Sequence, residues 1–249
     1  MQHDQHAGSF EADITPRAEC SSCPMYPDLP RNGNCVPGDA CVQVESGRQI
    51  DRFFRRNPVL ADRFLDDGFW VRRAIAVRYA SQQLLEPLIQ DQDEVVRRAV
   101  AYRIPLDHLE QLQNDPDREV RITVADRLPV DKLESMVNDE DYLVRCYVAR
   151  RLSAGRLFRM LNDRDSQVRK IVAQRISVSS LGLLVHDSDP GVRRIVAERI
   201  GPEQVIAFAH DSDWQVRFIA AQRAVLEDMP VFVRDDDPEI RGIALERLG

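Results

Sequence analysis

Residues 115–128 read Asp-Pro-Asp-Arg-Glu-Val-Arg-Ile-Thr-Val-Ala-Asp-Arg-Leu, and residues 139–152 read Asp-Glu-Asp-Tyr-Leu-Val-Arg-Cys-Tyr-Val-Ala-Arg-Arg-Leu. A dipeptide of Val or Ile followed by Arg begins at Val71, Val96, Val120, Val144, Val168, Val192, Val216 and Ile240. The intervals from Val96 onward are all equal, and the first, from Val71, is one residue longer. A fixed period of this length predicts a solenoid, because one such unit cannot bury its apolar face alone and stacks on its neighbours.

Two aspartates precede the Val in nearly every unit. One lies five residues before it in all eight units, and the other lies three residues before it in seven, with Gly68 as the exception. The second aspartate is a good N-cap, since its carboxylate can accept the free amide hydrogens of a first helical turn. The residues that follow form an apolar helical stripe of about 12 residues. The Leu-x-x-Leu segment between helices is short and favours a 3₁₀ turn, so we predict an all-α fold of eight repeats.

Each unit also has two arginines that fall within the apolar arc of the predicted helix. The first series is Arg72, Arg97, Arg121, Arg145, Arg169, Arg193, Arg217 and Arg241. The second series is Arg78, Arg103, Arg127, Arg151, Arg175, Arg199, Arg223 and Arg247. A buried guanidinium needs a carboxylate partner, so we predict Asp–Arg ladders between successive helices. The alternative is a groove in which the arginines bind an anion.

The exposed arc of the helices is mostly polar, with two departures. Tyr142, Leu143 and Cys146 occupy it in the fourth repeat, and Trp214 and Phe218 occupy it in the seventh. The first repeat adds Phe69 and Trp70. Exposed apolar side chains of this kind predict contacts with an unknown protein partner. The alternative is that caps, edges or curvature of the array cover them. Cys146 is expected to be an exposed free thiol.

Composition limits the possible functions. The net charge is −7; residues 1–58 contain 6 basic and 8 acidic side chains, and residues 59–249 contain 28 and 33. Neither part is the basic domain that nonspecific nucleic-acid binding favours. No apolar run reaches the roughly 18–20 residues of a membrane helix, and the N-terminus lacks the features of a signal peptide. We therefore expect a cytoplasmic protein without a membrane segment, for which nucleic acid is not the favoured partner.

Four cysteines lie close together in the chain, at Cys20, Cys23, Cys35 and Cys41. In a reducing compartment such a cluster more often binds metal than forms disulfides. The Cys20-x2-Cys23-Pro24 start and the Gly/Pro-rich loop before Cys41 favour an iron–sulfur cluster. Zinc remains an alternative, although ribbon-type zinc sites usually have two C-x-x-C pairs. Disulfides are the third alternative.

Residues 46–57 are predicted to form a short helix that ends before Pro58. Ile50, Phe53 and Phe54 would lie on one face and dock the cysteine module on the first repeat. A module this small needs a staple, so a cluster could serve only to fold the cap of the array. The other interpretation is a redox or sensing role.

The 24-residue unit Leu-x-x-Leu-x-x-Asp-x-Asp-x-x-Val-Arg-x-x-Val-Ala-x-Arg-Leu, preceded by this cysteine module, resembles the leucine-rich repeat variant family with an N-terminal iron–sulfur domain. The resemblance implies alternating α- and 3₁₀-helices in a right-handed superhelix. It also implies a 4Fe–4S cluster held by Cys20, Cys23, Cys35 and Cys41. The first repeat departs from the pattern at Gly68 and at Arg63, and has one extra residue.

The expected domains are an N-terminal tail (1–19), the four-cysteine module with its docking helix (20–58) and the repeat solenoid (59–249). The favoured function is a non-enzymatic interaction scaffold with a redox-active or redox-sensing 4Fe–4S cap. A nucleic-acid-binding repeat protein with a structural cluster or zinc is the alternative. An enzyme is disfavoured because His108, His186 and His210 are scattered over different repeats. The sequence leaves the oligomeric state open.

Overall fold

The structure, a computed structural model, describes residues 15–26 and 28–249 and divides after Leu112 into two compact units. Most of the predicted tail, residues 1–14, lies outside the described residues. The described residues contain helices and no strand, apart from one isolated bridge between Val36 and Ala40. Asn57 separates α2 (Gly47–Arg56) from η2 (Pro58–Phe64), so the predicted boundary after residue 58 falls just inside η2 and within the first unit.

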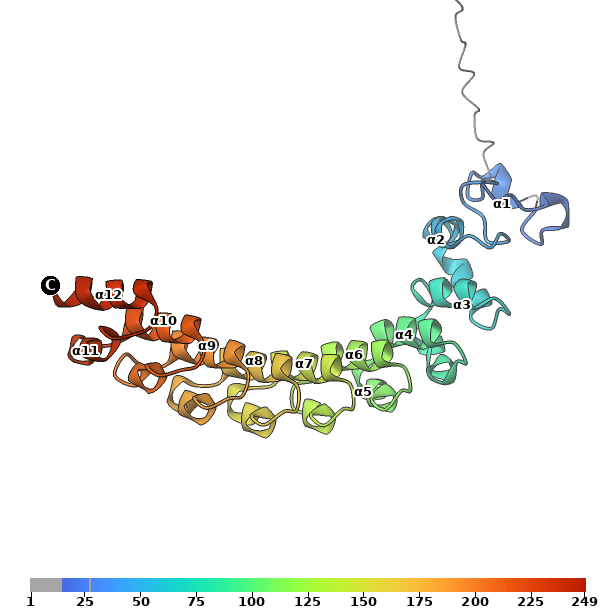
Figure 1. Cartoon of the computed structure of the whole chain (residues 1–249). Helices are drawn as coiled ribbons and strands as arrows, with labels where there is room; N and C mark the ends of the chain where they lie inside the picture. The colour runs from blue at the N-terminus through green and yellow to red at the C-terminus, as the bar shows by residue number, and fades with distance from the viewer. Residues whose placement is uncertain (1–14, 27) are drawn as a thin grey trace, which may run out of the picture. The chain divides into compact units, whose positions relative to one another are not determined.

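The first unit contains the cysteine module and the first repeats (Figure 1). Its remaining elements in chain order are η1 (Cys20–Ser22), α1 (Asp28–Arg31), α3 (Trp70–Val77), η3 (Gln82–Leu84), η4 (Glu86–Gln90), α4 (Glu94–Arg103), α5 (Leu106–Leu109) and η5 (Glu110–Leu112).

In the second unit, longer α-helices lie side by side in one layer and short helical segments form a second layer (Figure 1). The first layer comprises α6 (Arg118–Arg127), α7 (Tyr142–Arg151), α8 (Ser166–Arg175), α9 (Pro190–Arg199), α10 (Trp214–Arg223) and α12 (Pro238–Leu248). The second comprises η6 (Leu133–Met136), η7 (Ala154–Met160), η8 (Val178–Leu184), η9 (Val205–Phe208), η10 (Leu226–Asp228) and α11 (Met229–Phe232). The predicted all-α solenoid of alternating α- and 3₁₀-helices is confirmed.

The recurring aspartates begin the helices as predicted. Asp117 accepts hydrogen bonds from the Glu119 and Val120 amides at 2.9 and 3.1 Å. An N-terminal aspartate also caps α4, α7, α8, α9, α10 and α12. Only α3 lacks such a cap among the long helices of the described repeats, because Phe69 occupies that position. The repeat core consists of the Val, Ala and Leu positions that the period predicts, and most are fully buried.

The first arginine of the repeat forms the predicted ladder. Arg145 donates from Nε and Nη2 to the two carboxylate oxygens of Asp163, at 2.7 and 2.9 Å. Its Nη1 also donates to the Asp139 carbonyl at 2.7 Å. The same kind of pair joins Arg121 to Asp139, Arg169 to Asp187, Arg193 to Asp211 and Arg217 to Asp235. One guanidinium thus ties its own repeat to the next.

The second arginine differs from the prediction, because its partners are backbone carbonyls and not carboxylates. Arg175 Nη1 donates to the Ala149 and Leu152 carbonyls at 2.6 and 2.8 Å. Arg103, Arg151, Arg199, Arg223 and Arg247 also bond carbonyls of the preceding repeat. The last carbonyls of a helix have no partner within it, and this arginine supplies one from the next repeat.

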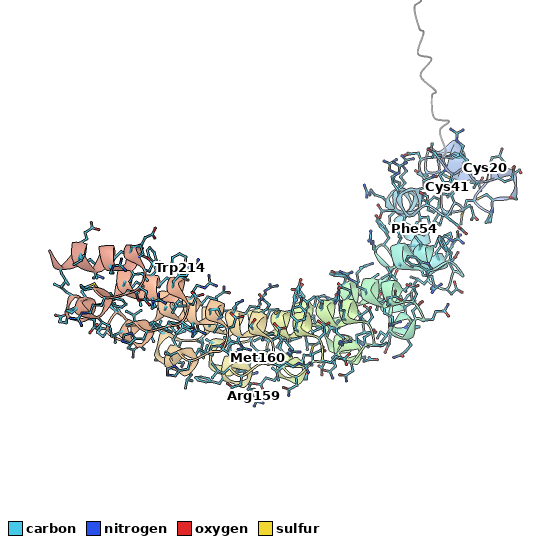
Figure 2. The ribbon with its side chains drawn as sticks, viewed as in Figure 1. Cys20, Cys41, Phe54, Arg159, Met160 and Trp214 are labelled. Carbon is cyan, nitrogen blue, oxygen red and sulfur yellow. The ribbon has the colours of Figure 1, made fainter. Side chains whose placement is uncertain are left out.

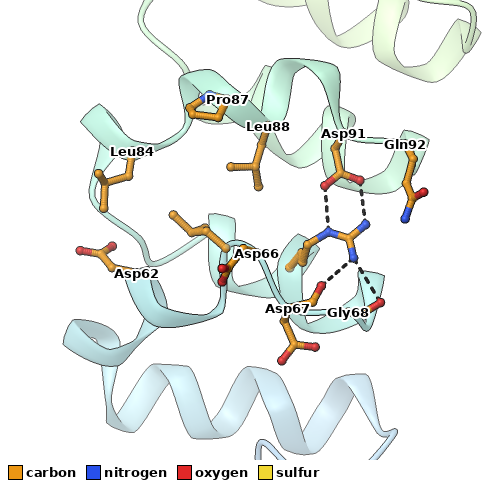
Figure 3. A pocket seen from close by; sticks show the side chains of 11 residues that line it. Asp62, Asp66, Asp67, Gly68, Leu84, Pro87, Leu88, Asp91 and Gln92 are labelled. Carbon is orange, nitrogen blue, oxygen red and sulfur yellow. Dashed lines mark hydrogen bonds and ion pairs between the residues drawn. The ribbon is translucent and has the colours of Figure 1, made fainter.

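The first repeat has the same spacing to the second repeat as the later repeats have to one another. The longer first interval results from counting Val71-Arg72 as the repeating dipeptide of the first repeat. Arg73, not Arg72, forms the ladder: it donates to both carboxylate oxygens of Asp91 at 2.8 Å and to the Asp67 carbonyl at 2.7 Å (Figure 3). Asp67, not Asp66, accepts the Phe69 amide at 2.8 Å, as Asp91 accepts the Asp93 amide. The sequence pattern gave the wrong register in the first repeat because Asp66-Asp67 and Arg72-Arg73 each offer two candidates for one position of the motif.

Candidate iron–sulfur module

Two tight backbone turns bring the first pair of cysteines together. The Cys23 amide donates to the Cys20 carbonyl at 3.1 Å, which closes η1. The Met25 amide donates to Cys23 Sγ at 3.4 Å. A backbone amide directed at a sulfur stabilises negative charge on that sulfur. Cys20 and Cys23 are both half-buried.

The second pair flanks a closed loop. The Val36 amide donates to the Ala40 carbonyl at 2.9 Å and the Ala40 amide to the Val36 carbonyl at 2.8 Å, so Cys35 and Cys41 lie next to the two ends of the bridge. Gly38 makes the turn possible with φ of 85°, which L side chains rarely adopt. The Gly/Pro-rich loop thus closes the turn between Cys35 and Cys41.

The four thiols are neighbours. Burial raises the pKa of the Cys35 thiol to about 11, and the nearby Cys41, Cys23 and Cys20 thiols contribute to that rise. Cys35 and Cys41 are buried, at 8% and 3% exposure. All five cysteines are free thiols in the structure, so it contains none of the disulfides that were the third alternative. Figure 2 shows Cys20 and Cys41 together in the first unit.

The four thiols supply the ligand type of a metal cofactor. A tetrahedral zinc site needs its sulfurs about 2.3 Å from one metal. Within residues 15–26 and 28–249, no three His, Cys, Asp or Glu side chains are placed to hold a single ion in this way. A cluster also takes four thiolates but spreads them over several irons. Cys20, Cys23, Cys35 and Cys41 provide that number of thiolates.

The docking helix α2 joins the module to the first repeat, as predicted. The Cys41 amide donates to the Gln49 carbonyl at 3.2 Å, and Asn57 Nδ2 donates to the Asn34 carbonyl at 2.8 Å. Arg52 and Arg56 both pair with Asp39. The module is therefore bonded to α2 through its backbone and through charges.

On its other side α2 packs against the repeat through aromatic rings. Ile50, Phe53 and Phe54 are fully buried. The Phe54 ring meets the Phe64 ring edge-on at 5.2 Å between centroids and lies 6.2 Å from the Tyr79 ring. Phe54 is labelled beside the first repeat in Figure 2. Such rings contribute large buried area and fixed relative orientations.

The predicted surface residues divide into two groups. Tyr142 and Trp214 are exposed, at 40% and 48%. Leu143 and Phe218 are half-buried, and the Phe218 ring lies 6.3 Å from the Trp214 ring. Partner contact at these positions stays a prediction.

Cys146 corrects a prediction. The thiol was expected on the surface, but it is buried, at 4% exposure. Burial raises its pKa, and Asp163 and Asp165 of the next repeat lie near enough to add to that effect. A single-helix projection counts this position as exposed because it omits the neighbouring helix that covers it.

These features define an α-helical repeat protein with an N-terminal cysteine module suited to an iron–sulfur cluster. A family described as "LRV protein FeS4 cluster" matches residues 16–63, and one described as "Leucine rich repeat variant" matches residues 95–117. A solved structure titled "A leucine-rich repeat variant with a novel repetitive protein structural motif" is 55% identical. It covers 94% of this chain and 100% of its own, with a TM-score of 0.90. The chain belongs to the leucine-rich repeat variant family, and its N-terminal domain is an iron–sulfur cluster domain.

A curated relative is an "Uncharacterized 27.7 kDa protein in nifB 3'region" of Rhodobacter capsulatus, 39% identical over 92 residues. The matched segment spans 37% of this chain and 37% of that relative. Among the described residues, none of the helices is long and apolar enough to span a membrane.

Proposed function

We propose that the chain is a non-enzymatic, cytoplasmic interaction scaffold whose N-terminal cap holds a redox-active or redox-sensing 4Fe–4S cluster. Cys20, Cys23, Cys35 and Cys41 are its proposed ligands. When bound, such a cluster exchanges one electron at a potential that hydrogen bonds to its sulfurs and solvent exposure adjust. The protein residues then have two tasks, which are to hold four thiolates and to present the array to a partner.

The observation that supports this proposal most is the bond between the Cys41 amide and the Gln49 carbonyl. Cys41 is a proposed ligand, and Gln49 lies in α2, one residue before the buried Ile50. The other face of α2 packs on Phe64 of the first repeat. A change in how Cys41 is held is therefore passed through one helix to the array. If the cluster only stapled the cap, oxidation of the cluster would not need to alter the contacts from Cys41 through α2 to the first repeat.

The nucleic-acid alternative is not favoured. It requires arginines exposed along one face, but the first series bonds carboxylates of the next repeat and the second series bonds carbonyls of the preceding one. The enzyme alternative needs convergent polar groups. His108, His186 and His210 belong to different repeats.

The test is anaerobic purification followed by iron and sulfide analysis, visible absorption and EPR before and after reduction. We expect about four irons per chain and a broad band near about 400 nm that bleaches with dithionite. Cys20→Ala should remove both, while Cys146→Ala, which alters a buried cysteine of the repeats, should keep both. Colourless protein with one zinc per chain would end the redox proposal.

Hydrogen exchange separates a sensing cap from a staple. The oxidised and reduced proteins are compared over α2 and α3. Altered protection of these helices on reduction supports sensing. Identical exchange, together with a potential too low for cellular reductants, would leave the cluster with a purely structural role.

A further inference from the structure

The α3–α4 groove is a cavity of about 440 Å³ between the two helices that follow the cysteine module. Its apolar lining includes Ala74, Ile75 and Ala99, and the rings of Trp70 and Tyr102 also line it. Both rings are exposed, Trp70 at 41% and Tyr102 at 54%. Two large exposed rings beside an apolar lining are typical of a site that buries a partner's side chain.

Later repeats mostly place polar side chains where this groove has apolar ones. Val95, 41% exposed, lies in the groove. The equivalent positions one, three, five and six repeats later are Glu119, Gln167, Gln215 and Glu239. The equivalents of Tyr102 are all polar or charged, namely Asp126, Arg150, Gln174, Glu198, Gln222 and Glu246. The apolar groove is therefore a local feature and not a consequence of the repeat.

The charged residues that line the groove are all basic. They are Arg78, Arg98 and Arg103, and no carboxylate is among the lining residues. Arg103 is bonded to the Val77 and Ala80 carbonyls, and the Arg98 guanidinium lies 5.8 Å from the centre of the Tyr102 ring. The Arg78 side chain is 65% exposed, with Asp51 at 3.6 Å. A positive groove on a chain of net charge −7 selects for a negative partner.

We propose that the α3–α4 groove is the docking site for an acidic protein segment with an apolar or aromatic anchor. The anchor side chain packs between Trp70 and Tyr102, and carboxylates of the segment pair with Arg78 and Arg98. This identifies the kind of partner for the scaffold proposed above, and so it rests on that function. Arginine and aromatic residues are the types that dominate binding energy in protein interfaces.

A nucleic acid fits the groove less well. Single strands are bound by basic and aromatic residues that continue along the backbone path. Here the position of Arg98 is taken by Ile122 one repeat later and by Cys146 two repeats later. The position of Tyr102 is taken by Asp126, a carboxylate that repels phosphate. Basic side chains return at the Arg98 position only three and four repeats later, as Lys170 and Arg194. The favourable residues are thus interrupted directly after the groove, which suits a short peptide segment.

The groove also contacts the helix that holds the cysteine module. A Cβ at Gly47 of α2 would lie 3.6 Å from Val71 Cγ1 and 3.7 Å from Ile75 Cδ1. Both residues line the groove. A segment docked there would therefore touch Val71 and Ile75, which pack against α2 at Gly47. Gly47 lies two residues before Gln49, whose carbonyl accepts the Cys41 amide.

The test is selection of binding segments from a displayed library of random peptides about 12 residues long. The target is the cluster-loaded full chain. Counterselection uses a Val95→Glu, Tyr102→Asp double variant, whose new residues are those found one repeat later. Selected peptides are then titrated against a Trp214→Phe chain, in which Trp70 is the remaining tryptophan and reports binding by its fluorescence.

We expect enriched peptides with net negative charge and at least one aromatic or aliphatic residue. Their affinity should fall about tenfold or more in Arg78→Glu, and should not change in Arg150→Glu, the same substitution at the equivalent, exposed position three repeats later. The absorbance of the cluster in each variant shows that the cap is intact. Enrichment of basic peptides, or equal binding to the double variant, would overturn the proposal.

Two further outcomes are informative. Tighter binding of a uridine oligonucleotide of about 12 nucleotides than of the selected peptides would replace a protein partner by a nucleic acid. Peptide binding by a chain whose cluster proves redox-silent would keep the docking site and remove only the redox part of the proposed function.

Discussion

Arg145 and Asp163 form a two-pronged ion pair between consecutive repeats, with side chains only 4% and 6% exposed. Removing one member of such a buried pair leaves an uncompensated charge. We expect Arg145→Met to lower the free energy of unfolding by about 3 kcal/mol, measured as the shift in urea midpoint. The control is Lys170→Met, which breaks the Lys170–Asp189 pair at 27% and 25% exposure and should cost about 0.5 kcal/mol. Equal losses in the two variants would contradict this ranking.

The carbonyl-binding arginines should stabilise the helix of the preceding repeat. In Arg175→Met, the Ala149 and Leu152 carbonyls lose a charged donor, at a cost of about 2 kcal/mol. Hydrogen exchange should locate the loss at the C-terminal end of α7. Arg150→Met is the control, because Arg150 is exposed and stacks on the Tyr147 ring. If protection falls uniformly across the array, the role assigned to Arg175 is wrong.

The N-terminal aspartates should each contribute a helix cap. Asp117→Ala removes the acceptor for two amides of α6, and we expect a loss of about 1 kcal/mol in thermal or urea unfolding. Asp126→Ala makes the same chemical change at an exposed position later in the same helix. That control should remain within about 0.5 kcal/mol of the parent chain.

The ladders predict a loss of stability in acid. Burial works to raise the pKa of Asp211, but hydrogen bonds from Arg193 and from the Asp213 amide hold the pKa below the ordinary value of 3.8. The same balance lowers the pKa of Asp235. The unfolded chain then binds protons more readily, so this stabilisation is complete above pH 3.8 and is lost as pH falls through the folded values.

The measurement is the urea midpoint between pH 7 and about pH 2.5. Arg193→Met removes the donor that lowers the pKa of Asp211, so its midpoint should fall less steeply in acid than that of the parent chain. Parallel curves for the two proteins would show that the Arg193–Asp211 pair does not contribute to the acid transition.

Cys146 should be chemically inert in the native protein. Its side chain is buried and its pKa is raised, and alkylation requires an exposed thiolate. We expect iodoacetamide to label the half-buried Cys20 and Cys23 after anaerobic removal of the cluster and to label Cys146 only after unfolding, as read by mass spectrometry. Rapid labelling of Cys146 in the native chain would show that the fourth repeat opens.

Much of the fold follows from the sequence, because residues within each repeat mark where its helix begins. The capping aspartates and the period give the helix starts, and the buried arc identifies both arginine series. The partners of the second series could not be predicted, since a helical projection does not distinguish a carboxylate from the end of a neighbouring helix. The register at Asp67 and Arg73 was missed because adjacent identical residues satisfy the pattern twice, and only the reach of the guanidinium to Asp91 decides between them.

The candidate site was predicted in part. Residue type and spacing are sufficient to propose the four cysteines, whereas the link from Cys41 to Gln49 depends on how the loop closes. The α3–α4 groove was not predicted, because its first-repeat residues Trp70 and Arg78 align with the later repeats only after the correct register is applied to the first repeat. With that register, Trp70, Tyr142 and Trp214 occupy the same position of the unit, each three repeats after the one before.

The ladder of Arg145 and Asp163 has a consequence for how this chain can change in length. Every bond of the ladder in the second unit connects one repeat to its immediate neighbour, at separations that are the same from repeat to repeat. Duplication or loss of one whole unit therefore re-creates each bond with an equivalent partner. Insertion of a single residue between Arg145 and Asp163 would instead change the separation of that one pair, because the later arginines and carboxylates shift together. A change in length by whole repeats thus preserves every ladder bond, whereas an insertion inside a repeat costs the one bond that spans it.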